Sequence, residues 1–101
     1  MTFSEVARIG VAVGGPVPLP IWVLALITRT TAQEAVREGI SAAAVWPSAV
    51  KTSFAVARVR RRVAARVYRE FPWPKLIARE LGTTAHTVRW WVKRQQREEA
   101  A

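Results

Sequence analysis

The chain has 101 residues, the usual size of one small domain. It contains no cysteine and a single histidine, which excludes a disulfide framework and a zinc site built from three or four protein ligands. The net charge is +9, and all of it arises in residues 51–101, because basic and acidic residues balance in residues 1–50. A one-sided excess of this kind favours a polyanionic partner.

The first part of the chain is apolar and interrupted. We expect a short helix over residues 3–13, ended by the glycines and prolines of residues 14–20. Residues 9–28 carry no charge, but these breaks leave residues 21–27 as the longest clean apolar stretch, which is too short to cross a bilayer. This stretch predicts a buried helix or a face that packs on a second subunit. Glu5 stands where a signal peptide has basic residues, so we expect a cytoplasmic protein without a membrane partner.

The next predicted element is a helix over residues 31–46. Thr31 and Glu34 have the spacing of a capping box, Gly39 marks a break, and Pro47 ends the element. A second DNA-reading motif in this segment is disfavoured. Glu34 would occupy one of its core positions, and Pro47 would interrupt its second helix.

Three helices are predicted in the second half. The longest spans residues 50–71, where apolar residues recur every three or four positions, as on one helix face. These residues are Val56, Val59, Val63, Val67 and Phe71. Pro74 suits the first turn of a short helix over residues 74–81. After a turn, a last helix is predicted over residues 85–97, with residues 98–101 frayed.

No segment shows the regular alternation of a strand, so the predicted fold class is all-α. We expect a small helical bundle in two parts. Residues 1–50 would form an apolar part for packing or oligomerisation, and residues 51–101 would form a basic part that binds DNA.

Residues 74–93, PKLIARELGTTAHTVRWWVK, resemble the helix-turn-helix core of bacterial and phage regulators. That family has a small residue at the fifth place and a glycine at the ninth, supplied here by Ala78 and Gly82. Thr84 is a good N-cap for the second helix, whereas Thr83 departs from the usual Val or Ile. The contacts between the two helices would come from Ile77, Leu81, Val88 and Trp91. The resemblance implies that the bundle ends in a helix-turn-helix.

It also implies how DNA is contacted, because the second helix of this family lies in the major groove. The outward positions of that helix are Thr84, Ala85, His86, Arg89, Trp90 and Lys93. Arg89 would read guanine through two hydrogen bonds. Phosphates would be met by Lys93, Arg94 and Arg97, and by Arg58, Arg61 and Arg62 of the long helix. The alternative for each arginine is a solvated surface position.

The two adjacent tryptophans, Trp90 and Trp91, are expected to differ in burial. Trp91 falls on the buried face of the last helix and Trp90 on the exposed face. Trp90 would pack on a sugar-phosphate wall, stack on an unpaired base, join a subunit contact, or lie along Lys93 or Arg94.

Residues 31–97 are also similar in layout to the C-terminal DNA-binding domain of the replication initiator DnaA. The similar blocks are EGISAAAV, AVARVRRRVAAR and KLIARELGTTAHTV. Thr83 and Thr84 replace an Arg-Asp pair of that domain, and His86 is one position out of register. Only the layout is carried over, which implies a long basic helix on phosphates in front of a groove-reading helix.

The predicted function is sequence-specific binding of double-stranded DNA, as in a small transcriptional regulator of phage or mobile-element type. We expect a homo-oligomer, with a dimer favoured. The alternatives are a small terminase subunit or recombination accessory factor, and a basic helical module that binds a protein or a membrane surface. No nucleophile–base pair, metal cluster or phosphate loop is evident, so neither catalysis nor a cofactor nor a metal is expected.

Overall fold

The computed structural model describes residues 18–46 and 52–100, and these two ranges contain helices and turns but no strand. The elements are α2 (Ile21–Glu38), the 3-10 helix η1 (Ala42–Ala44), α3 (Phe54–Glu70), α4 (Pro74–Leu81) and α5 (Ala85–Ala100). The predicted all-α class is therefore confirmed for the described residues. The helix predicted over residues 3–13 and the break at Pro47 lie outside them.

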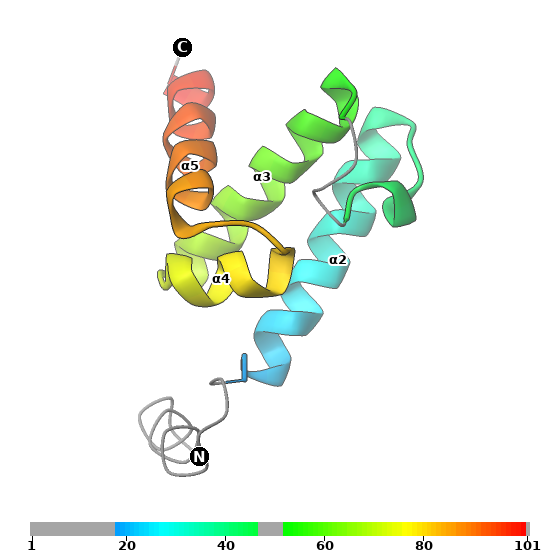
Figure 1. Cartoon of the computed structure of the whole chain (residues 1–101). Coiled ribbons are helices and arrows are strands. Elements are labelled where there is room, and N and C mark those ends of the chain that lie inside the picture. Colours follow the sequence, from blue (N-terminus) through cyan, green and yellow to red (C-terminus); the bar gives the residue numbers. More distant parts are fainter. Residues whose placement is uncertain (1–17, 47–51, 101) are drawn as a thin grey trace, which may run out of the picture.

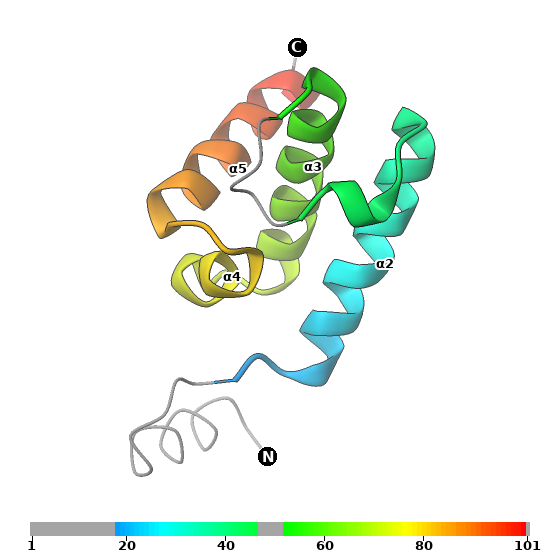
Figure 2. The ribbon, with the colours of Figure 1, turned by 45° about the vertical axis from the view of Figure 1, so that its right-hand side comes forward.

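The helix α3 is the centre of the bundle. It packs against α2 on one side and α5 on the other, and α4 lies across the end of α3 and α5 (Figure 1). The rotated view keeps α2 and α5 on opposite sides of α3 (Figure 2). This arrangement leaves one long face of α2 and one long face of α5 at the two outer sides of the molecule.

The helix α2 corrects two of our expectations. It is continuous from Ile21 to Glu38, so the apolar stretch of residues 21–27 and the segment that follows form one helix. Thr31 is not a capping residue, because it is buried and its Oγ1 accepts a hydrogen bond from Trp46 Nε1 at 3.2 Å. The expected capping box is wrong because α2 begins at Ile21, so Thr31 lies within the helix, where its hydroxyl binds Trp46.

The predicted helix over residues 31–46 is also too long. At Gly39 the backbone adopts a left-handed conformation with φ of 70°, and the Ile40 N–H donates to the Ala35 carbonyl at 2.9 Å. This closure satisfies the last carbonyls of the helix and stops it. Of residues 40–46 only η1 is helical, so Gly39 marks the end of α2 and not a break within a longer helix.

The helix α3 begins at Phe54 and not at residue 50. The Ser53 Oγ accepts a hydrogen bond from the Val56 N–H at 3.2 Å, which caps the first turn. Of the predicted stripe, Val56 is only half-buried. The other members, Val59, Val63, Val67 and Phe71, are buried, as the spacing predicted.

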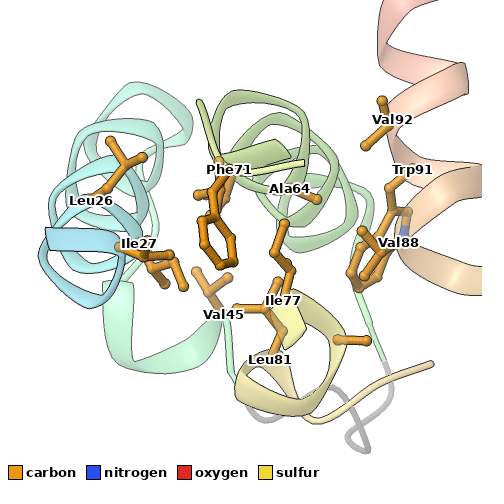
Figure 3. Close-up of a cluster of buried hydrophobic side chains, with 14 of the residues drawn as sticks. Leu26, Ile27, Val45, Ala64, Phe71, Ile77, Leu81, Val88, Trp91 and Val92 are labelled. Atoms are coloured by element: carbon orange, nitrogen blue, oxygen red, sulfur yellow. The ribbon is translucent and has the colours of Figure 1, made fainter. Parts of the chain in front are cut away.

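All four α-helices of the described ranges contribute to one core (Figure 3). Ile77 of α4 is fully buried and lies between Phe71 and Val88, so it joins α4 to both α3 and α5. Trp91 is 8% exposed, whereas Trp90 is 52% exposed. The predicted division between the two tryptophans is confirmed.

Candidate nucleic-acid interface

The turn between α4 and α5 is closed at both ends by hydrogen bonds. Gly82 has φ of 70°, and the Thr83 N–H donates to the carbonyl of the buried Ala78 at 2.9 Å, which ends α4. The Thr84 Oγ1 accepts a hydrogen bond from the Thr87 N–H at 3.2 Å, and the Thr84 carbonyl accepts one from the Val88 N–H at 3.1 Å. Gly82 and Thr84 therefore end and begin the two helices as predicted, and they fix how α5 leaves α4.

Replacing Thr84 with alanine should lower the free energy of unfolding by about 1 kcal/mol, because one helix N–H loses its acceptor. Urea denaturation followed by circular dichroism measures this loss. Thr84→Ser keeps the hydroxyl and should retain most of the stability. Equal losses in both variants would show that the threonine methyl group, and not the cap, matters.

The outward face of α5 is basic. The exposed side chains of residues 85–97 recur every three or four positions around this face, whereas Val88, Trp91, Val92 and Gln95 point to the core. Apart from Gln96, the exposed set is His86, Arg89, Trp90, Lys93, Arg94 and Arg97. Residues 85–97 contain no acidic residue. We call these six side chains the α5 face.

The cations of the α5 face are not neutralised within the described part of the chain. Neither Arg89, Lys93 nor Arg97 forms an ion pair with any residue of 18–46 or 52–100. The Arg94 guanidinium lies over the Trp90 ring, 5.6 Å from its centroid, so Trp90 adopts the arrangement along Arg94 that was one of its expected alternatives. Of the other two predicted contact residues, Thr84 is exposed and Ala85 is half-buried.

One neighbour of the α5 face was missed from the sequence. A surface hollow of about 220 Å³ lies between α3 and α5, and it is lined by Tyr68 together with Arg89 and Lys93. The phenol can donate a hydrogen bond to a phosphate, as the adjacent cations can. The apolar stripe of α3 gave no signal for this residue, because Tyr68 lies beside the stripe and is half-buried.

The arginines predicted as phosphate clamps on α3 have partners inside the protein. Arg58 donates two hydrogen bonds to Glu38, at 2.9 and 3.0 Å, and Arg62 donates a third at 2.8 Å. Arg61 is buried and bonds to Glu98. These three side chains stabilise the contacts of α3 with α2 and α5, and they are not part of the α5 face.

The last turn of α5 corrects another expectation. Instead of fraying after residue 97, α5 continues to Ala100. Glu98 pairs with Arg61, and Glu99 lies 3.7 Å from the Arg69 guanidinium. Glu98 and Glu99 therefore pair with arginines of α3 and not with the cations of the α5 face.

The pairing of Glu38 gives the bundle an acid-sensitive element. Hydrogen bonds from Arg58 and then Arg62 lower the pKa of Glu38 from 4.5 to about 2, although burial opposes this shift. Because the folded-state pKa lies below the unfolded value, the stabilisation is complete above pH 4.5 and is lost as the pH falls towards 2.

We therefore expect the free energy of unfolding to fall between pH 4.5 and about pH 2, and to fall less steeply in Glu38→Gln. Urea denaturation at a series of pH values measures both slopes. Glu80→Gln is the matched control, since Glu80 is exposed on α4 and forms no ion pair with the described residues. A slope that is unchanged in Glu38→Gln would contradict the assignment.

Other kinds of site find no support in the described ranges. Among residues 18–46 and 52–100, no three His, Asp or Glu side chains gather where they could hold a metal ion. No helix there combines the length and the apolar character needed to cross a membrane. Comparisons of the chain with protein-family models, with curated proteins and with solved structures find no match. The side-chain geometry of α5 is therefore what a functional assignment rests on.

Proposed function

We propose that this chain binds double-stranded DNA and reads its sequence, as a small transcriptional regulator. In this proposal α4, the turn and α5 act as a helix-turn-helix, and α5 enters the major groove, whose width of about 12 Å admits a helix. The observation that carries the proposal is the α5 face, where Arg89, Lys93 and Arg97 are exposed without an ion pair to the described residues.

The arginines of α3 that were predicted to contact phosphates differ from the cations of the α5 face, because those of α3 have acidic partners within the protein. Arg58, Arg61 and Arg62 of α3 are matched by glutamates of α2 and α5. No acidic residue is interspersed on the α5 face. A surface that only keeps a protein soluble has charges of both signs mixed together. A continuous row of cations along one helix is instead suited to displacing counterions from a polyanion.

The position of each side chain along α5 suggests its role. Arg89 lies near the N-terminal end, which reaches deepest into the groove in this motif, and its planar group matches the two acceptors of guanine. Arg94 and Arg97 lie farther along the helix and suit phosphates. Lys75 and Arg79 are exposed on α4, the helix that crosses the DNA backbone in this motif.

The experiment that tests the proposal is selection of random duplex DNA on the purified full chain at physiological salt. Enrichment of one short motif supports a sequence-reading protein and gives its site. Retention of DNA without any motif would contradict sequence reading and favour a packaging or architectural role. No retention would overturn DNA binding and leave the α5 face to an acidic protein or a membrane surface.

A further inference from the structure

The outer face of α2 has no partner among the described residues. The inner face of α2 packs on α3 and η1, whereas five exposed residues form a line along the helix, two of which, Thr28 and Ala32, also border a hollow beside η1 and α4. These residues are Ile21, Ala25, Thr28, Ala32 and Val36, and all five are exposed. We call them the α2 stripe. The apolar residues at its two ends are 85% and 79% exposed, so the stripe is open from one end to the other.

We infer that the α2 stripe binds a second copy of this chain in antiparallel orientation. The intervals of three and four residues keep the stripe on one helix face, as in paired helices. Its order of side chains is large, small, threonine, small, large, which is nearly the same in both directions. A two-fold interface requires that one surface be complementary to itself.

The two-fold arrangement specifies the opposing residues. With the axis between residues 28 and 29, Ile21 of one copy faces the partner copy's Val36, and Ala25 faces the partner copy's Ala32. The small alanines let the two helices approach to the lower end of the usual 8–10 Å between helix axes. The larger residues then close both ends of the contact and exclude water from it.

Two polar atoms in and beside the stripe have hydrogen-bond partners in their own copy. The Thr28 hydroxyl donates to the Leu24 carbonyl at 3.0 Å, which leaves its methyl group for the contact. The Gln33 Oε1 accepts a hydrogen bond from Arg66 at 3.1 Å. A second copy can therefore cover the five side chains of the stripe without leaving the Thr28 hydroxyl unsatisfied. Arg29 lies beside the stripe and next to the axis, so the pair brings two exposed cations near each other, and water and salt screen their repulsion.

Electrostatics favours this face over the other long free face of the molecule. The α2 stripe carries no charged residue and has one cation, Arg29, beside it, whereas each copy of the α5 face carries four cations and two copies would repel each other strongly. A pair formed through α2 also leaves α5 uncovered, because α3 lies between them (Figure 2). The inference rests on the surface of α2 and holds whether or not the protein binds DNA.

The size of the contact sets its strength. From Ile21 to Val36 the helix is about 23 Å long, so a single helix pair is at the lower end of interface sizes. We expect a dimer that dissociates at micromolar concentration. Sedimentation of the full chain without DNA, from about 1 to about 500 μM, should show the mass rising from 11.3 kDa towards twice that value.

Charge substitutions link that mass change to α2. Ala32→Glu puts a carboxylate into the stripe of each copy and should hold the mass at 11.3 kDa throughout. Gln96→Glu makes the same change of charge at an exposed position of α5 and should dimerise normally. Circular dichroism checks that both variants are folded. A mass of 11.3 kDa at every concentration for the native chain, or an assembly that Ala32→Glu does not affect, would overturn the inference.

Cysteine cross-linking tests the orientation, even if Ala32→Glu fails to fold, because the chain has no cysteine of its own. A disulfide needs Cα atoms within about 7 Å of each other. A mixture of Ala25→Cys and Ala32→Cys should give chiefly the mixed disulfide, and Thr28→Cys should link to itself. Self-linked Ala25→Cys and Ala32→Cys without a mixed product would show a parallel pair and overturn the antiparallel arrangement.

Discussion

Replacing Arg89 with alanine is expected to relax the choice of one base pair in the bound DNA by about 5- to 150-fold, the equivalent of 1–3 kcal/mol for a bidentate contact. Arg89 is exposed and forms no ion pair with the described residues, so its removal should leave the fold intact. Fluorescence anisotropy with the selected site and its single-base variants measures the change. The native protein should discriminate at one position where Arg89→Ala does not.

Lys93→Ala is the matched comparison for a phosphate contact. It should weaken binding to every duplex alike and make the slope of log K against log salt shallower by about one. Arg58→Ala is the second comparison, because Arg58 is held by Glu38. It should lower stability and leave the salt slope unchanged. Equal losses for Arg89→Ala and Lys93→Ala on every probe would contradict the placement of α5 in the groove.

Replacing Ile77 with alanine is expected to lower the free energy of unfolding by about 2–5 kcal/mol, through lost burial and the cavity left behind. Ile77 is fully buried where α4 meets α3 and α5, so its truncation would leave a cavity among three helices. A domain of this size is stable by only about 5–15 kcal/mol, so the variant should lose a large share of its stability.

Urea denaturation measures this effect, with Leu76→Ala as the control. Leu76 is the adjacent residue of the same helix and is only partly buried, so its truncation should cost clearly less. If the two variants lost equal stability, Ile77 would not be the junction of the core. The result bears on function as well, because the same junction holds α5 in place.

Features set by local chemistry were predictable from the sequence. Proline at the start of α4, glycine at its end and the threonine cap of α5 each act within a few residues. Helix periodicity alone predicts the burial of the α3 valines at positions 59, 63 and 67. It also predicts that Trp91 is buried and Trp90 is exposed. For the same reason the exposed residues of the α5 face could be identified before the structure was known.

Features that depend on distant partners were not predictable. Thr31 and Glu34 have the spacing of a helix start, but they bind Trp46 and the α3 arginines instead. Glu98 and Glu99 extend α5 because α3 supplies arginines beside them. The sequence shows the charge of α3 without showing which acids neutralise it, so Arg58 could not be distinguished from Arg89.

Arginines of α3 are paired with glutamates only in the folded chain. A polyanion that binds these arginines therefore competes with folding. In the unfolded chain the α3 arginines separate from Glu34, Glu38 and Glu98, and every cation becomes available to a flexible polyanion such as heparin or single-stranded RNA. A ligand of this kind binds the unfolded state over more of its length than the folded state, and so lowers the apparent stability. Duplex DNA bound by the α5 face would raise it. The two nucleic-acid forms would thus shift the folding equilibrium of one +9 chain in opposite directions.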